Sequence, residues 1–341
     1  MSQYDDDPAD VTFGVDAVEE VETAAGGADE YIIGTHEIGS VNALCTPSDN
    51  ILVSVGDDKG IQLWDLGAEK MLHRMQNNRI IKSVIAMSEN IIATGNEDGT
   101  IKTWDIDPEA ENEDGEKKKW SQRARRLETL EGHTGAVLAL TRVNATTLVS
   151  GSNDTTLIAW ESDTGTQITK LEGHTASVNG VIAVDDSTIA SCSADRSVKI
   201  WHFAPNEPGG SSLKISMDDC HKGQNVLALC RISEAVIVSG GGDMLAKVWD
   251  VSDGGCLSSL AGHTSAVQAL AVIGDRMLAS GSADMTVRLW DIDAHYKLVK
   301  TVGAAKGGIN FSINGLCAVS DTRFASAADN IKIWSIEVDK V

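Results

Sequence analysis

The sequence predicts an all-β fold, a seven-bladed β-propeller of four-stranded antiparallel blades whose ring is closed by an N-terminal strand. The first observation is that seven of the eight tryptophans recur at intervals of 40, 56, 41, 48, 41 and 44 residues. The second is that short β-branched and apolar runs, separated by Gly, Asp and Asn turns, lie around each of them, as in strands at hairpin spacing. The recurring tryptophans are Trp64, Trp104, Trp160, Trp201, Trp249, Trp290 and Trp334, and Trp120 is out of register.

The residues around the tryptophans repeat as well. The sixth repeat reads Gly262-His263, then Ser280, then Asp284, then Trp290-Asp291, and the third and fourth repeats keep the same order. Repeats of roughly 40–45 residues with Gly-His and Trp-Asp marks are typical of four-stranded propeller blades. In these marks the chain resembles the WD-repeat family, and the resemblance covers about residues 30–337.

The third observation concerns ring closure. The last recurring tryptophan lies seven residues before the end of the chain, which leaves little sequence for an outer strand in the seventh repeat. The run Tyr31-Ile32-Ile33-Gly34 precedes His36 in the way that outer strands precede the Gly-His pairs of other repeats. We therefore expect the N-terminal segment to supply the missing strand, which would remove an open sheet edge.

Five repeats also carry a Ser-His-Asp set, which on its own would suggest a hydrolase. A catalytic site needs one such set in one cleft, whereas here each Asp falls six residues before the Trp and four after the Ser. A buried indole N–H needs an acceptor, and the family resemblance implies that Trp, Ser, His and Asp form a hydrogen-bonded chain. The five structural networks are then His36, Ser54, Asp58 and Trp64; His133, Ser150, Asp154 and Trp160; His174, Ser191, Asp195 and Trp201; His221, Ser239, Asp243 and Trp249; and His263, Ser280, Asp284 and Trp290.

Two repeats depart from this pattern. The second keeps Thr94 and Asp98 but has Asn77 in the place of the histidine, and the seventh has no histidine and displaces its acid to Asp329. We expect these two blades, which flank the first, to be less rigid than the others.

Composition and charge narrow the function classes. The chain has 341 residues, 42% of them hydrophobic, and a formal net charge of -22, which argues against nucleic acid and anionic membranes as direct partners. No apolar run is long enough to span a bilayer, and the acidic start does not resemble a signal peptide, so the cytoplasm is the expected location and the nucleus the alternative. The scattered cysteines are expected to be core thiols rather than disulfides or zinc ligands. Residues 1–29 are predicted to be an acidic, disordered tail and residues 30–341 the propeller.

Partner binding is expected in loops. The family resemblance implies docking on the face that carries the Gly-His and Asp turns, through side chains just after the Gly-His stretch and just before the turn Asp. Among the side chains at these positions Lys82 is the single cation and no arginine occurs, so we expect neutral or basic partner segments and no phosphopeptide pocket. The partner-binding candidates are Asn42, Asp57, Lys82, Glu97, Asn153, Asn179, Gln268 and Asn314.

An insertion at about residues 107–126 in the second blade is a further candidate. It carries six acids followed by six bases, with Trp120 among the bases. It is either a docking element around Trp120 or a self-neutralising loop.

The favoured function is a non-enzymatic protein-interaction scaffold or adaptor, without catalytic residues, cofactors or metals. The alternative is an acidic module that recognises basic chromatin or ribosomal proteins. A propeller hydrolase is less favoured, because inner strands such as Ala139-Leu140 present small apolar residues to the channel.

Overall fold

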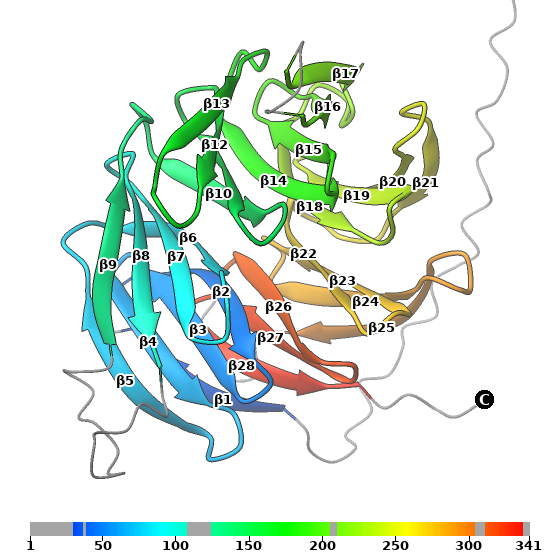
Figure 1. Cartoon of the computed structure of the whole chain (residues 1–341). Coiled ribbons are helices and arrows are strands. Elements are labelled where there is room, and N and C mark those ends of the chain that lie inside the picture. The colour runs from blue at the N-terminus through cyan, green and yellow to red at the C-terminus, as the bar shows by residue number, and fades with distance from the viewer. Residues whose placement is uncertain (1–29, 37–38, 108–123, 205–209, 304–310, 337–341) are drawn as a thin grey trace, which may run out of the picture.

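A computed structural model describes residues 30–36, 39–107, 124–204, 210–303 and 311–336. These residues form seven four-stranded antiparallel sheets arranged around a ring (Figure 1). The seven-bladed propeller predicted from the tryptophan spacing is therefore confirmed, and the described residues contain no helix.

Blades one to six each run from an inner strand to an outer strand in chain order. Blade one consists of β2 (Val41–Ser48), β3 (Ile51–Gly56), β4 (Gly60–Asp65) and β5 (Lys70–Gln76), blade two of β6 (Ile81–Ala86), β7 (Ile91–Asn96), β8 (Ile101–Ile106) and β9 (Ala124–Leu130), and blade three of β10 (Val137–Arg142), β11 (Thr147–Ser152), β12 (Leu157–Glu161) and β13 (Gln167–Leu171). Blade four consists of β14 (Val178–Asp185), β15 (Thr188–Ser193), β16 (Val198–His202) and β17 (Ser212–Met217), blade five of β18 (Val226–Arg231), β19 (Val236–Gly241), β20 (Ala246–Asp250) and β21 (Cys256–Leu260), and blade six of β22 (Val267–Ile273), β23 (Met277–Ser282), β24 (Thr286–Asp291) and β25 (Lys297–Gly303).

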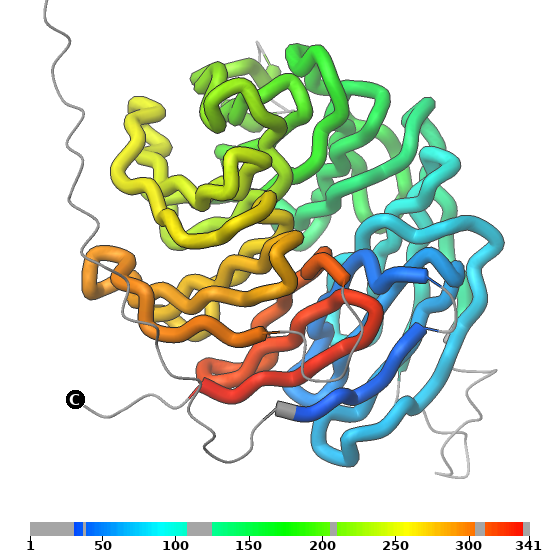
Figure 2. The backbone as a smooth tube through the Cα atoms, turned by 180° about the vertical axis from the view of Figure 1, so that it is seen from behind, coloured from blue at the N-terminus to red at the C-terminus, as the bar shows by residue number. Residues whose placement is uncertain are grey.

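Blade seven combines the two ends of the described chain. Its strands are β26 (Gly315–Ser320), β27 (Arg323–Ala327), β28 (Asn330–Ser335) and, as the outer strand, β1 (Glu30–Thr35). The pair β1 and β28 is antiparallel, with Tyr31 opposite Ile333, and the two strands run side by side in Figure 2. The predicted closure of the ring by the N-terminal strand is thus confirmed.

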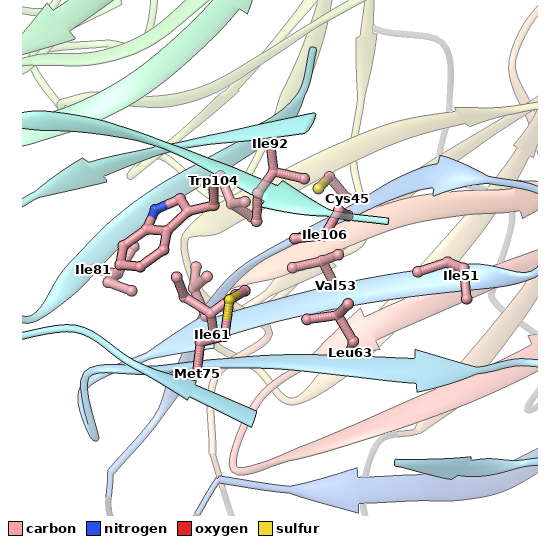
Figure 3. Packing of buried hydrophobic residues seen from close by; sticks show 12 residues of the cluster. Cys45, Ile51, Val53, Ile61, Leu63, Met75, Ile81, Ile92, Trp104 and Ile106 are labelled. Atoms are coloured by element: carbon pink, nitrogen blue, oxygen red, sulfur yellow. The ribbon is translucent and has the colours of Figure 1, made fainter. Parts of the chain in front are cut away.

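Neighbouring blades pack face to face through buried apolar side chains. Between blades one and two, Val53 and Ile61 of one sheet meet Ile81 and Trp104 of the next (Figure 3). The second strand of blade one, β3, is buried along its whole length, since a blade sheet is covered on both faces by its neighbours. This explains why such strands are continuous apolar runs rather than alternating ones.

The inner strands of blades one to six share an irregularity near their start. Their register with the second strand shifts by one residue, which leaves a single bulged residue unpaired and redirects its side chain. We call the face of the ring that carries these bulges and the turns between second and third strands the upper face, and the face with the turns between inner and second strands the lower face. The bulged residues are Asn42, Lys82, Leu138, Asn179, Leu227 and Gln268.

The cysteine prediction is correct for four of the six residues. Cys45, Cys192, Cys220 and Cys230 are buried free thiols, whereas Cys317 is half-buried and Cys256 is exposed on the outer strand β21. The prediction was wrong for Cys256 because an outer strand shows one face to solvent.

Candidate functional site

The tetrads of Trp, Ser, His and Asp form continuous hydrogen-bonded chains in five blades. In blade four the indole nitrogen of Trp201 donates to Ser191 Oγ at 2.8 Å, Ser191 lies 2.7 Å from His174 Nε2, and His174 Nδ1 lies 2.8 Å from Asp195 Oδ2. The same three contacts recur in blades one, three, five and six at 2.6–2.9 Å. Each tetrad ties the third strand, the second strand, the preceding loop and the upper-face turn of one blade together.

The carboxylate end of the chain is held by the turn that contains it. Asp195 accepts hydrogen bonds from the Thr175 amide and from the amide and hydroxyl of Ser197. Burial works against the charged form, but these bonds and the one from His174 lower the pKa of Asp195 to about 2. Burial also lowers the pKa of His174, so the ring is neutral, with its Nδ1 proton assigned to the bond with Asp195.

The geometry matches that of a catalytic triad, yet the serine cannot reach a substrate. Ser191 has an exposed fraction of 0%, and its oxygen already accepts the Trp201 indole N–H. A nucleophile needs an open approach for the substrate and a donor pair for the oxyanion. The tetrads therefore hold strands, loop and turn together in the five blades that carry them.

Blade two replaces the histidine by a buried lysine and an amide pair. Lys102 Nζ donates to Asn77 Oδ1 at 2.7 Å and to Asn78 Oδ1 at 2.6 Å, and Asn77 donates to Asn96. Burial lowers the pKa of Lys102, although the nearby Asp98 works in the opposite direction. Trp104 still donates its indole N–H, to the Thr94 hydroxyl at 2.9 Å.

Blade seven keeps only the hydrogen bond between the tryptophan and the serine of the tetrad. Trp334 donates to Ser326 Oγ at 2.8 Å, and the Lys332 ammonium lies 5.4 Å from the Trp334 ring centre, with an exposed fraction of 1%. Asp329, the displaced acid, makes no hydrogen bond within the described part of the chain.

Three of the predicted partner-binding amides hold neighbouring blades together. A β-bulge changes the hydrogen bonding of its strand. On the upper face, each of these three side-chain amides donates to the backbone carbonyl of the residue just before a bulge. Asn42 Nδ2 of blade one donates to Ile81 O of blade two at 2.8 Å, and Asn179 Nδ2 of blade four to Val226 O of blade five at 2.7 Å. Asn314 likewise donates to Val41 O, from blade seven to blade one, at 3.3 Å.

Two further candidates meet across blades one and two. Lys82 Nζ lies 3.2 Å from Asp57 Oδ1, and Asn42 donates to the same carboxylate oxygen at 2.9 Å. Burial opposes the charged form of Asp57, but the bonds from Asn42 and Lys82 lower its pKa. Asn42, Asp57 and Lys82 thus form one polar cluster on the upper face, across blades one and two.

The remaining candidates are not brought together by direct contacts. Glu97 and Asn153 are exposed on the upper-face turns of blades two and three. Gln268 is half-buried, and its Oε1 atom is enclosed without a hydrogen-bond partner. Trp120 and most of the charged insertion lie outside the described residues, and Arg125 and Arg126 belong to strand β9 rather than to a loop.

Sequence reasoning did not single out the residue that follows each turn Asp. This residue has a positive φ in six blades, where a side chain is disfavoured and glycine is not. Only blade two has glycine there. Alignment of the other turns with this glycine would have indicated that the matching residues also adopt the left-handed conformation. The six residues are Lys59, Gly99, Thr155, Arg196, Met244 and Met285.

The lower face is rich in unpaired acids. In six of the seven turns between inner and second strands an exposed carboxylate makes no hydrogen bond or ion pair with the described residues. Beside them a hollow of about 420 Å³ lies between blades three, four and five, lined among others by Arg142, Ile182, Asp186 and Arg231. The acids of the six turns are Asp49, Glu89, Asp186, Glu234, Asp275 and Asp321.

The described residues contain neither a candidate metal site nor a candidate membrane-spanning helix. No group of three or more His, Cys, Asp or Glu side chains in this part of the chain is placed to hold a metal ion. Within the same residues, no helix is long and apolar enough to cross a membrane.

Four of these repeats match a known family model. The family model described as WD domain, G-beta repeat matches residues 29–65, 124–161, 165–202 and 254–291. Each match begins near the outer strand of one blade and ends with the third strand of the next, so the sequence repeat is offset by one strand from the blade. The first match accordingly begins at β1, the outer strand of blade seven. No curated protein sequence matched the chain.

A solved structure supports the same assignment. The crystal structure of the WD40 beta propeller domain of Doa1 is similar with a TM-score of 0.74 at 21% sequence identity, over 91% of this chain and 97% of that chain. At this identity the similarity shows the fold alone. The chain therefore contains WD40 repeats, and it folds as a seven-bladed WD40 propeller.

Proposed function

We propose that the chain is a non-enzymatic scaffold or adaptor whose upper face binds segments of partner proteins. WD40 propellers generally bind other proteins. The observation that carries the proposal is the polar cluster of Asn42, Asp57 and Lys82, which spans blades one and two on the upper face. Its groups are held in place by one another and half-exposed, so they are oriented before a partner arrives.

The chemistry of this cluster favours neutral or basic segments. Asp57 stays ionised because of its low pKa, and Glu97 on the next blade is exposed. Lys82 is already paired with Asp57, so it is a poor anchor for a phosphate, which is normally bound by several converging arginines. We do not expect a phosphopeptide pocket at this cluster, and we propose the cytoplasm or the nucleus as the location of the protein.

Charge reversal at one residue tests the proposal. Lys82→Glu places a second carboxylate next to Asp57 and should abolish or change the set of proteins captured by the full chain from its native cell. Lys214→Glu is the matched control, because it makes the same charge change on the exposed outer strand β17. If Lys82→Glu and Lys214→Glu capture the same proteins as the wild type, the upper face is not the binding surface.

A second candidate function, recognition of basic chromatin or ribosomal proteins, is favoured by the acids of the lower face. Six unpaired carboxylates on adjacent turns create a negative field that attracts cationic partners and weakens with salt. The triple variant Glu234→Gln, Asp275→Asn and Asp321→Asn should then weaken binding of a lysine-rich synthetic peptide and reduce its salt dependence. Binding of that peptide that is unaffected by the triple variant would argue against this candidate.

A further inference from the structure

The outer strand of blade six, β25, differs from the other outer strands at the rim of the ring (Figure 1). Six of its seven residues are exposed, and Leu298 and Val299 have exposed fractions of 37% and 56%. Within the described residues, every other outer strand exposes at most one large apolar side chain. The far edge of β25 pairs with no strand in this part of the chain, so it can accept a further strand.

Two unpaired lysines make the same strand basic in a protein whose net charge is -22. Lys297 and Lys300 are exposed and form no ion pair within the described residues, and β25 contains no acid. The nearest carboxylates along the chain, Asp291 and Asp293, are both paired with Arg276. The strand thus offers an open edge, apolar surface and positive charge to one extended segment.

The N-terminal part of the chain contains a segment with the matching chemistry. Residues 1–29 carry nine acids and no basic residue. Within them, the run Asp10-Val11-Thr12-Phe13-Gly14-Val15-Asp16 alternates apolar with small or polar residues, which is typical of a strand with one apolar face. An acid closes this run at each end, and the run has the same length as β25.

The position of this segment in the chain allows it to reach β25. Residue Glu30 begins β1, the outer strand of blade seven, and blade seven packs directly against blade six. Residues 17–30 span about 45 Å when extended, whereas packed sheets lie about 10 Å apart. The outer strands of the blades on either side, β21 and β1, contain Glu30 as their one acid, so they present little charge that would repel the segment.

We infer that residues 10–16 bind to the open edge of β25 as a fifth strand of blade six. Backbone hydrogen bonds hold the segment, and its apolar side chains lie against Leu298 and Val299. Its carboxylates lie near Lys297 and Lys300. An edge that is paired within the molecule does not pair with another chain. This contact does not depend on the proposed function.

Chymotrypsin measures the contact in the full chain, because it cuts after Phe13 inside the segment and after Tyr4 outside it. The test variant is Lys297→Glu with Lys300→Glu, which reverses both charges of β25. It should raise the rate of cutting after Phe13 about tenfold and leave the rate after Tyr4 within about twofold, because cleavage follows the fraction of time that the segment is open.

The matched control is Lys70→Glu with Lys214→Glu, which makes the same charge change on the outer strands β5 and β17 and should leave both rates unchanged. Equal acceleration by the two double variants would show that the net charge of the molecule, and not β25, holds the segment. Equal rates after Phe13 in the wild type and in the β25 variant would overturn the inference. Protection of Phe13 that increases with protein concentration would overturn it too, because the segment would then lie on a second copy.

Hydrogen exchange tests the contact from the side of β25. Proline cannot donate to a strand partner, so Val11→Pro with Val15→Pro should prevent the segment from pairing. The amides of β25 should then exchange about tenfold faster than in the wild type, whereas those of the outer strand β21 should not change. Val18→Pro with Val21→Pro, the same changes outside the segment, is the control and should leave β25 as in the wild type. Exchange of β25 that is the same in both proline variants would show that residues 10–16 do not bind there.

Discussion

The indole nitrogen of Trp201 lies 2.8 Å from the hydroxyl oxygen of Ser191, and neither side chain is reached by solvent. The same hydroxyl lies 2.7 Å from His174 Nε2, so one oxygen atom serves two buried nitrogen groups. Loss of this oxygen leaves both groups without a partner in a place that water does not reach.

Ser191→Ala should therefore lower the free energy of unfolding by about 2–4 kcal/mol, because each unsatisfied buried polar group costs about 1–3 kcal/mol. The measurement is the midpoint of urea unfolding. Ser212→Ala is the control, since Ser212 is exposed on the outer strand β17 of the same blade, its hydroxyl makes no hydrogen bond with the described residues, and its loss should cost within about 0.5 kcal/mol. Equal midpoints for the two variants would show that the tetrad does not stabilise the blade.

Acid should destabilise the protein through the histidines of the tetrads. Burial lowers the pKa values of His133, His174, His221 and His263 below 6.5 in the folded chain. Below pH 6.5 the unfolded chain binds more protons than the folded one, so stability falls as the pH falls through this range. Urea midpoints between pH 7.5 and 5 should decrease, and His174→Gln should make the decrease shallower.

The tetrad carboxylates affect stability in a lower pH range than the histidines. The pKa values of Asp154 and Asp195 are about 2, against the ordinary 3.8. Their contribution is complete above the ordinary value and is lost as the pH falls toward 2. A stability that stays constant from pH 7.5 to 5 would contradict the neutral state assigned to the histidines.

Ring closure should depend on a single glycine in β1. A Cβ atom added to Gly34 would lie 1.9 Å from Cη2 of Trp64, so Gly34→Ala forces the strand away from blade one. Overpacking of this kind costs about 1–3 kcal/mol. The melting temperature should fall, and proteases should cut near residue 30 more readily, whereas Thr35→Ala, an exposed change in the same strand, should leave both unchanged.

The blade arrangement was predictable because each blade buries a tryptophan at one fixed place. A buried indole such as that of Trp160 needs an acceptor, so Ser150 and His133 recur with it at constant spacing, and this pattern sets the register of every strand. The outer strand β1 of blade seven could be predicted from the same repeat pattern, because its residues precede His36 as outer strands precede the histidines of other repeats.

Contacts between blades could not be predicted in this way. Asn42 and Asn179 were predicted only as partner-binding residues, and their amides also donate to carbonyls of the next blade, about 40 residues or more along the chain. Such a partner is not visible in the residues around the asparagine. The left-handed positions of Arg196 and Met244 were also missed, because only the single Gly99 among the aligned turns indicates them.

Blades two and seven should exchange their backbone amide hydrogens faster than blades three and four. In blade seven no histidine connects Ser326 to an upper-face turn, and in blade two the connection is made by Lys102, whose charge is disfavoured by burial. Opening of these blades therefore breaks fewer or weaker contacts, and local opening governs exchange. Hydrogen exchange measured by mass spectrometry should show earlier labelling of β7 and β27 than of β11 and β15, which are the matching second strands. Equal protection of the four strands would show that the buried lysines replace the histidine tetrads fully.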